Sequence, residues 1–410
     1  MKYVDEIYPF GLNTTIGPTG TIKRLFRNSD FFTNRGYEMT IFALQAPSDN
    51  NTLCEIHSLP EASTSSLSVP INNNGNGLKS ILKSKKHAIA VNYYLASAFS
   101  RKIALRANAR YIKDYINFNR KPDIVVFHEM DSCFHYLKYR DSCSSKVVLF
   151  IHGDGSDGEM FLKRFPKFAG KREYKDMLAN LLFCYKQCDC IVWISKLAKE
   201  RFCHHHPEYA HKSVAVVNGI DDILPIERIV DSDFKYRLVT TGTVCERKGQ
   251  YIIVEAMHRM KKEVLKDTHL TIIGSGPDYA YLKTLSEEYG LNNHISFTGS
   301  VLNSDVPNYL AKENIYVLMS NNEGLPISII EAMRSGLPVI STQVAGIPEE
   351  VDERNGLLIE PDINQLVEIL DRLPEHNWER MGISSRRRFE EEFTFQIMRE
   401  KYADMFESLL

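Results

Sequence analysis

Short apolar runs alternate with longer amphipathic stretches over almost the whole chain. In the first half, the apolar runs that predict strands are 37–44, 123–128, 146–152 and 190–195. Amphipathic stretches at 21–34, 88–118 and 172–187 predict helices. Compact apolar strands separated by helices are typical of a parallel sheet covered on both faces. The pattern therefore predicts a doubly wound α/β unit.

The alternation restarts after the polar segment 222–233. Strands are predicted at 237–241, 270–273, 295–298, 315–319 and 339–342, and helices at 250–262, 279–289, 306–313 and 328–334. A last amphipathic helix is predicted over about 393–410. At 410 residues the chain is too long for one ordinary core. We therefore predict an α/β protein with domains at 1–222 and 223–393, followed by a terminal helix at 394–410.

Composition indicates a globular protein in a reducing compartment. Hydrophobic residues make up 43% of the chain and charged residues 25%, which is ordinary for a soluble protein. No apolar run reaches the roughly 18 residues of a membrane-spanning helix, and the N-terminus lacks the apolar core of a signal peptide. The eight irregularly spaced cysteines fit reduced thiols. We expect a cytoplasmic location.

The net charge of −2 hides an asymmetry between the two halves. Residues 1–210 carry 29 basic and 20 acidic side chains, whereas residues 211–410 carry 21 and 32. Eleven basic residues fall between Lys79 and Lys121, which favours contact with an anionic surface such as a membrane. Tyr94–Tyr115 fits an interfacial helix or an ordinary solvated one. The preceding polar stretch 63–77 fits a lid, an acceptor loop or a simple linker.

The most informative motif places Glu323 and Glu331 around the start of a helix. Between them stand four residues suited to a helix-opening turn, namely Gly324, Leu325, Pro326 and Ile327. Free N–H groups in such a turn suit an anion, and carboxylates accept hydrogen bonds from hydroxyl groups. Phosphate beside hydroxyls describes a nucleotide-sugar. The alternative is an amphipathic helix with two solvated glutamates.

This segment resembles the donor-site signature of glycosyltransferase family 4, the group 1 glycosyltransferases. These are retaining enzymes with the GT-B fold, in which two Rossmann-like domains face a central cleft. The resemblance implies metal-independent transfer from a nucleotide-diphospho-sugar. It also implies that Glu331 binds the ribose and Glu323 the transferred sugar.

The segment 240–249 matches a second family motif, a strand ending in a glycine turn followed by a cation. Lys248 stands where the family has a lysine that neutralises the departing diphosphate, and Gly242 forms the turn. The family usually has arginine directly after this glycine, where this chain has Thr243. Arg247 can supply the missing charge, although its side chain is expected to point away from that of Lys248. A plain surface lysine is the alternative for Lys248.

Two further strand ends match the family's base-binding loops. Gly274 and Gly276 follow one strand, and Val301 lies just beyond the next. A lone Gly-x-Gly also suggests a dinucleotide site, but Tyr279 stands where the third glycine would be.

Candidate residues in the first half lie at strand ends and in one glycine turn. His152 ends a buried strand, and in the family this histidine contacts the transferred sugar; a structural role is the alternative. His128 is a second candidate, and 218–221 matches a junction element that we interpret as structural. Gly17 and Gly20 precede a helix and form an acceptor or phosphate loop, or a plain turn.

No metal site or additional cofactor is predicted. Cys203 with its neighbouring histidines, and Cys184 with Cys188 and Cys190, lack the paired spacing of a zinc site. The leading hypothesis is a retaining hexosyltransferase in capsule, O-antigen or lipopolysaccharide synthesis, acting on a glycan or lipid-linked glycan. The alternatives are a non-catalytic partner subunit and a nucleotide-sugar epimerase. Nucleic acid is not an expected partner, because the basic region carries no recognition module.

Overall fold

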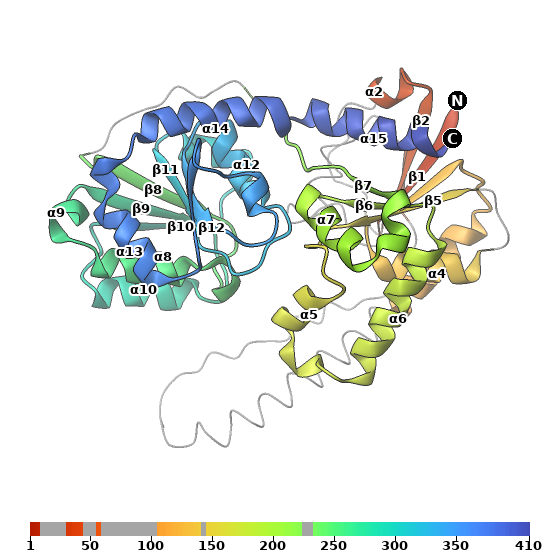
Figure 1. Ribbon diagram of the computed structural model, residues 1–410, viewed down its shortest axis with the longest axis horizontal. Helices are drawn as coiled ribbons and strands as arrows, with labels where there is room; N and C mark the ends of the chain where they lie inside the picture. Colours follow the sequence, from red (N-terminus) through yellow and green to blue (C-terminus); the bar gives the residue numbers. More distant parts are fainter. Residues whose placement is uncertain (9–29, 44–54, 59–104, 141–144, 224–232) are drawn as a thin grey trace.

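The computed structural model describes residues 1–8, 30–43, 55–58, 105–140, 145–223 and 233–410. They form two α/β halves that lie side by side (Figure 1). Each half is built on one sheet in which all strands run parallel. The prediction of two doubly wound parallel sheets is therefore confirmed.

The first sheet has seven strands in the order β3-β2-β1-β4-β5-β6-β7. Their bounds are β1 Lys2–Tyr8, β2 Tyr37–Ala43, β3 Glu55–Ser58, β4 Ile124–Phe127, β5 Lys146–Ile151, β6 Cys190–Trp193 and β7 Ser213–Ala215. The helical segments of this half are α2 Asp30–Thr33, residues 105–117, α4 Met130–Tyr139, α5 Glu159–Arg164, η1 Pro166–Phe168, α6 Arg172–Gln187, α7 Lys196–His205 and η2 Pro207–Lys212.

The second sheet has six strands in the order β10-β9-β8-β11-β12-β13. Its strands are β8 Tyr236–Thr241, β9 Thr268–Ile273, β10 Ile295–Gly299, β11 Ile315–Leu318, β12 Val339–Thr342 and β13 Gly356–Ile359. Its helical segments are η3 Glu246–Lys248, α8 Gln250–Arg259, α9 Lys262–Leu265, α10 Tyr279–Glu288, α11 Val306–Leu310, α12 Ile327–Arg334, η4 Ile347–Glu349, α13 Ile363–Asp371, η5 Leu373–Glu375 and α14 Trp378–Glu392.

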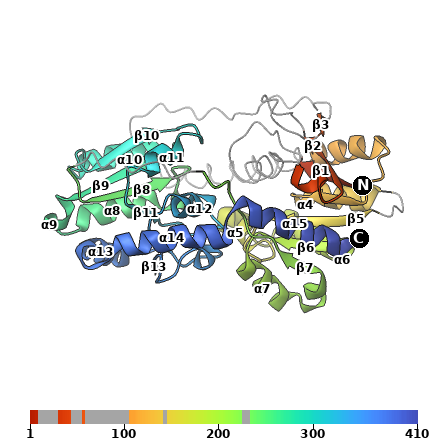
Figure 2. The same ribbon diagram turned by 90° about the horizontal axis from the view of Figure 1, so that it is seen from above.

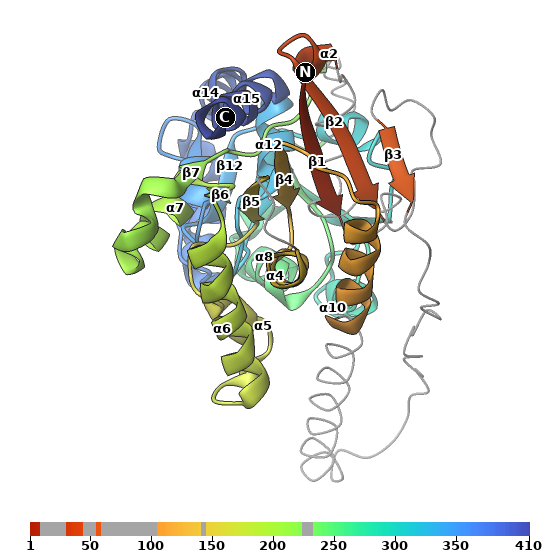
Figure 3. The ribbon, with the colours of Figure 1, turned by 90° about the vertical axis from the view of Figure 1, so that its right-hand side faces the viewer.

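The last two helices run along both halves of the molecule (Figure 2). α14 lies on the second half, and α15 (Phe395–Leu409) continues onto the first sheet, so the two chain ends lie near each other (Figure 1). Tyr402 of α15 stacks on Phe150 with ring centroids 5.2 Å apart, and Phe406 packs against Tyr37 at 5.4 Å. In Figure 3, α15 lies on one side of the first sheet and α4 and α6 lie on the other.

Both faces of the first sheet are buried, which explains the apolar character of its strands. Val126 and Val148 face the cluster that includes α15, whereas Val125 and Val147 face the cluster that includes α4 and α6. This arrangement follows from the alternation of side chains along a strand.

Two of the differences from the sequence-based expectation concern strand β1 and the helix predicted over 250–262. Strand β1 was not predicted, because the buried acids Asp5 and Glu6 lie at its centre. The single helix predicted over 250–262 is two helices, α8 and α9. Asp5 is compatible with burial because Arg120 and the hydroxyl of Tyr115 both donate to its carboxylate, at 3.2 and 2.8 Å.

Several predicted segments lie outside the described residues, namely Gly17, Gly20, 63–77 and 79–104. In the described part of the basic region, Arg106, Arg110 and Lys113 are exposed, while Tyr111 and Tyr115 are buried against the sheet. The aromatic side of this stretch is thus already covered by protein, which leaves its basic side to face outward. Within the described ranges, no helix is both long enough and apolar enough to cross a bilayer.

Candidate functional site

A cavity of about 500 Å³ lies where the carboxyl ends of strands from the two sheets face each other. Most of its lining comes from the second half, and His152, Ile194 and Asn218 come from the first. Ligands of doubly wound sheets bind in crevices at the carboxyl ends of the strands. This position makes the cavity the candidate binding site.

Glycine turns at the ends of β8 and β9 form one wall of the cavity. Gly242 and Gly274 have positive φ values of 126° and 134°, which glycine adopts at low cost. A side chain on Gly274 would place its Cβ 1.9 Å from the carbonyl oxygen of Gly242. The two turns therefore pack backbone against backbone, with no room for a side chain on Gly274.

Two cations converge on one carboxylate in the lining of the cavity. The Nζ of Lys248 lies 2.7 Å from Glu323 Oε1, and Arg247 Nη1 lies 2.9 Å from the same oxygen. The hydroxyl of Ser320 also donates to Glu323 Oε1, at 2.7 Å. With one negative and two positive charges, the cluster carries a net positive charge suited to an anion.

This cluster keeps Glu323 ionised although its side chain is only 8% exposed. Burial raises the pKa of the Glu323 carboxyl, but the charges of Lys248 and Arg247 outweigh that effect and leave the pKa below its ordinary value. The expectation that Arg247 points away from Lys248 is wrong. Both residues lie in the tight turn η3, which brings their side chains to the same oxygen.

The first turn of α12 forms the floor of the cavity. Gly324, Leu325, Pro326 and Ile327 line it, and so does Glu331 one turn further along the helix. The first N–H groups of a helix have no partner within the helix, and the helix dipole adds positive potential there. The floor thus combines the opening turn of a helix with the carboxylate of Glu331, as the motif predicted.

The two halves meet closely at this floor. A Cβ on Gly324 would lie 3.1 Å from the carbonyl oxygen of His152 and 3.0 Å from Ile194 Cδ1. Gly346 packs against Gly324 from the other side and donates its N–H to the Gly324 carbonyl at 3.0 Å. The small residues of the motif therefore allow the first half to approach the helix turn.

His152 extends from the end of β5 into the cavity wall. Burial and, secondarily, the neighbouring His128 lower the pKa of His152 to about 3, so its imidazole is neutral near pH 7. A neutral imidazole can donate one hydrogen bond and accept another. His128 lies behind His152 and does not line the cavity, so the structure places this second candidate one layer away from a ligand.

Thirteen of the predicted site residues line this one cavity. They are His152, Gly242, Thr243, Arg247, Lys248, Gly274, Val301, Glu323, Gly324, Leu325, Pro326, Ile327 and Glu331. Gly276 does not line it; a Cβ there would lie 2.3 Å from the carbonyl oxygen of Val244, so this glycine serves packing. Gly17 and Gly20 lie outside the described residues.

Sequence reasoning missed some lining residues and undervalued one. Asn218, interpreted as structural, lies in the cavity wall, and its buried Oδ1 has no hydrogen-bond partner within the described part of the chain. Ser300 and Asn303 also line the cavity. The only available signal for Asn218 was its place at the junction of the two predicted domains.

Among the residues considered for zinc, Cys188 lies beside Cys133, with their sulfur atoms 3.5 Å apart in the core of the first half. His206 pairs with Asp157, and Cys184 is buried in the core of the first half. No group of three or more metal-binding side chains with suitable placement occurs among the described residues.

Comparisons with known proteins place the chain in a family. The profile described as Glycosyl transferases group 1 matches residues 226–392, and that described as Glycosyltransferase Family 4 matches residues 23–223. The amylovoran biosynthesis glycosyltransferase AmsK of Erwinia amylovora is 30% identical over 183 residues, which cover 42% of this chain and 45% of AmsK. The matches span about half the length of the curated relatives.

Solved structures show the same fold over the full chain. Sucrose-phosphate synthase of Thermosynechococcus elongatus has a TM-score of 0.74 at 17% identity, covering all of this chain and 99% of that one. HepE of Anabaena, solved in complex with UDP, has a TM-score of 0.68 at 14% identity over all of both chains. The fold is thus the GT-B fold, as the resemblance implied. Since the two profiles together extend from residue 23 to residue 392, the chain belongs to the group 1 glycosyltransferases of glycosyltransferase family 4.

Proposed function

We propose that this protein is a retaining glycosyltransferase that uses a nucleotide-diphospho-sugar and requires no metal ion. One observation carries the proposal. A single cavity holds the Lys248–Glu323–Arg247 cluster, the opening turn of α12 and the carboxylate of Glu331. This combination suits a diphosphate next to a ribose.

Different residues of the cavity bind different parts of the proposed donor. Lys248, Arg247 and the N–H groups of the α12 turn hold the diphosphate, and they stabilise the charge that develops as it departs. Glu331 accepts hydrogen bonds from ribose hydroxyls. Glu323 binds the sugar from one side, and the neutral imidazole of His152 binds it from the other.

The geometry also supports a role for closure of the cleft. Because His152 and Ile194 come from the first half and the diphosphate site from the second, the cavity is complete only when the halves are together. A closed cleft excludes water, which limits hydrolysis of the donor. The acceptor then attacks from the face that the diphosphate leaves.

We further propose a glycan or lipid-linked glycan as the acceptor, in surface polysaccharide synthesis at the cytoplasmic face of a membrane. The match to a relative named for amylovoran biosynthesis supports this acceptor class. The exposed Arg106, Arg110 and Lys113 support contact with anionic headgroups. Flotation with phosphatidylglycerol vesicles tests the contact; equal binding to phosphatidylcholine vesicles would contradict it.

The first experiment is thermal unfolding with UDP, GDP, ADP and their sugars, with Mg²⁺ and with EDTA. We expect one nucleotide to raise the melting temperature by several degrees under both conditions, because a ligand that binds only the folded state stabilises it. Lys248→Ala and Glu331→Ala are expected to lose this shift. An absence of any shift would favour a non-catalytic partner, and a shift seen only with Mg²⁺ would contradict metal independence.

Product analysis then separates transfer from epimerisation. The stabilising donor is incubated with and without a lipid-linked glycan acceptor, and the anomeric configuration of the product is determined by NMR. Transfer with retention is the expected outcome. Conversion of the donor to a second sugar without acceptor would identify an epimerase.

A further inference from the structure

A chain of three polar side chains runs from the cavity into the core of the first half. His152 Nε2 lies 3.2 Å from Nδ1 of His128, and His128 Nε2 lies 2.8 Å from Oε2 of Glu6. These residues lie at or near the carboxyl ends of β5, β4 and β1, which are adjacent strands of the sheet. The chain therefore connects a residue of the cavity wall to a fully buried carboxyl group.

The surroundings of Glu6 favour its neutral, protonated form. Its side chain is fully buried, its Oε1 has no hydrogen-bond partner in the described part of the structure, and no lysine or arginine is paired with it there. Burying an ionised carboxylate with an unsatisfied oxygen in an apolar core costs much free energy, whereas burying a neutral carboxylic acid costs much less. Burial and the charge of the neighbouring Asp5 raise the pKa of Glu6 well above its ordinary value.

The middle imidazole is neutral and held rigidly. Burial lowers the pKa of His128 to about 3. Its ring stacks on Phe150 with centroids 5.0 Å apart, and the ring of Tyr8 meets its edge at 6.0 Å. Tyr402 of α15 also stacks on Phe150, so the terminal helix packs next to this series of hydrogen bonds.

The donor and the acceptor of each hydrogen bond in this series then follow from the neutral form of Glu6. A neutral Glu6 donates its O–H to His128 Nε2, so the proton of this neutral imidazole resides on Nδ1. That N–H donates to His152 Nε2, which leaves the proton of His152 on its own Nδ1. His152 Nδ1 has no partner within the described residues, and the residue lines the cavity.

We propose that Glu6 and His128 are positioning residues that hold His152 as the Nδ1–H tautomer, so that it presents a hydrogen-bond donor to an oxygen of the bound sugar. The part that concerns the sugar rests on the function proposed above. The tautomer itself is a property of the ligand-free protein.

The test is NMR of the ligand-free full chain with ¹⁵N-labelled histidine. Nitrogen shifts distinguish an N–H nitrogen from a bare one, and comparison with His152→Gln assigns the ring. We expect His152 as the Nδ1–H tautomer in the wild type and in Glu6→Gln, whose amide can donate as the neutral acid does. Glu6→Leu and His128→Phe remove the donor while keeping the site apolar, and they are expected to give a mixture of tautomers.

Kinetics provide the second readout. With the donor that stabilises the protein, Glu6→Leu is expected to lower kcat about fivefold to tenfold, the size of one neutral hydrogen bond, and to leave the KM for the donor nearly unchanged. Glu6→Gln is expected to restore most of this loss. A folded Glu6→Leu variant, judged by its melting temperature, makes the comparison valid.

The outcomes separate the two proposals. Finding His152 with its proton on Nε2 in the wild type would overturn the proposed positioning role of Glu6 and His128, even if transfer activity is present. An unchanged tautomer in both Glu6→Leu and His128→Phe would overturn it as well. The expected tautomers in a protein without transfer activity would support this positioning role and would contradict the proposed function instead.

Discussion

At the scale of single residues, the cavity lacks the arginine that the family usually has, and Arg247 places a positive charge in the same cavity. Family members usually carry an arginine after the first glycine turn, and here Thr243 takes that place. Arg247 instead reaches the same carboxylate as Lys248, at 2.9 Å, although 44% of its side chain is exposed. Its exposure leaves the guanidinium able to turn toward a phosphate.

We therefore expect Arg247→Ala to weaken binding of the preferred nucleotide diphosphate about tenfold or more, the size of one charge-assisted hydrogen bond. Adding the family's arginine with Thr243→Arg is expected to recover most of that affinity, because Thr243 is exposed in the same cavity. Isothermal titration calorimetry of the two single variants and the double variant measures this. If Thr243→Arg has no effect in the Arg247→Ala background, the two positions do not share a role.

A second residue-scale prediction concerns Glu313, which is buried away from the cavity. Burial raises the pKa of Glu313 to about 7. Between pH 4.5 and 7 the unfolded chain has lost this proton while the folded chain keeps it, so the free energy of unfolding falls as pH rises. Below pH 4.5 both states are protonated and the penalty disappears.

Glu313→Gln removes this titration. We expect it to raise the free energy of unfolding by about 1–3 kcal/mol at pH 7.5 and to change it little at pH 4, since one pKa unit corresponds to about 1.36 kcal/mol. Urea unfolding at both pH values measures the difference, with the exposed Glu287→Gln as control. An equal effect of Glu313→Gln at the two pH values would contradict the assignment.

At the scale of elements, the turn between η3 and α8 fixes the position of Lys248. Gly249 has φ +69°, and a Cβ there would lie 1.9 Å from the carbonyl oxygen of Met319. Gly290, at the end of α10, has the same φ, but no atom lies within 4 Å of its ideal Cβ. Comparing alanine variants of these two glycines therefore separates the free-energy cost of a left-handed backbone from the cost of a steric clash.

Gly290→Ala is expected to lower the free energy of unfolding by about 1–2 kcal/mol, the cost of a left-handed conformation for an L-residue. Gly249→Ala is expected to cost clearly more and to abolish stabilisation by the nucleotide, because the chain around Lys248 must move. Urea unfolding and thermal shifts measure the two effects. Equal losses of stability in the two variants would show that the contact with Met319 is unimportant.

Elements with a local signature were predictable from the sequence, and those that depend on distant partners were not. The strand ends and glycine turns of the second half follow from apolar runs and glycine spacing, which are short-range signals. Strand β1 was missed because the hydrogen-bond partners of its central acids, Arg120 and His128, lie more than 100 residues away in the sequence. The convergence of Arg247 and Lys248 depends on the tight turn of η3, which no periodicity reveals.

At the scale of the whole molecule, the polypeptide passes between the two halves at two adjacent places. A polar contact also links the halves. Ile220 and Thr394 form a bridge where the crossings meet, and Ile220 exchanges backbone hydrogen bonds with Phe393 and Phe395 at 3.0 and 2.8 Å. We expect these crossings to act as the pivot of any movement between the halves. The polar contact is formed where Glu349 of η4 meets the start of α7.

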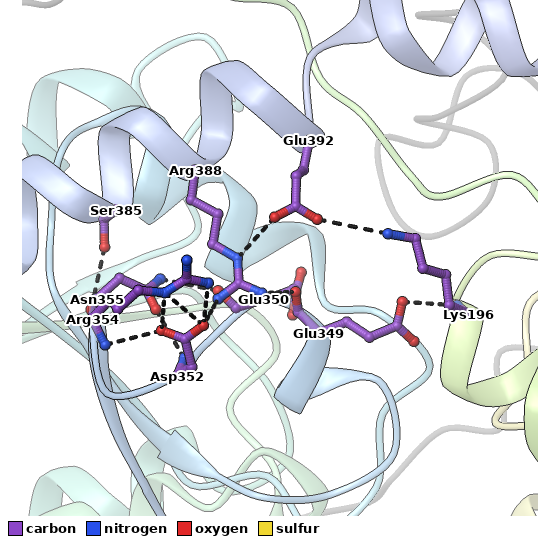
Figure 4. A network of polar contacts seen from close by, with 9 residues as sticks. All are labelled: Lys196, Glu349, Glu350, Asp352, Arg354, Asn355, Ser385, Arg388 and Glu392. Carbon is purple, nitrogen blue, oxygen red and sulfur yellow. Dashed lines mark hydrogen bonds and ion pairs between the residues drawn. The ribbon is translucent and has the colours of Figure 1, made fainter.

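Glu349 caps a helix of the opposite half. Its carboxylate accepts hydrogen bonds from the N–H groups of Lys196 and Leu197, at 2.7 and 2.5 Å, and from the hydroxyl of Ser195 at 2.5 Å. Figure 4 shows Glu349 beside the network around Arg388, which donates to the Glu349 carbonyl at 2.7 Å and thereby holds the turn in place. Lys196 also approaches Glu392 of α14, at 3.8 Å.

Because a carboxylate at a helix N-terminus gains from the helix dipole as well as from its hydrogen bonds, we expect Glu349 to favour the closed arrangement by about 1–3 kcal/mol. Glu349→Ala is then expected to increase the radius of gyration measured by small-angle X-ray scattering and to lower kcat, while the nucleotide that stabilises the wild-type protein still binds. Glu353→Gln, an exposed acid four residues away, serves as the control. The α7 helix itself is expected to remain, since Ser195 still accepts from the N–H of Ala198 at 3.0 Å. An unchanged radius of gyration together with an unchanged kcat would show that the pivot and the cavity contacts suffice to hold the halves together.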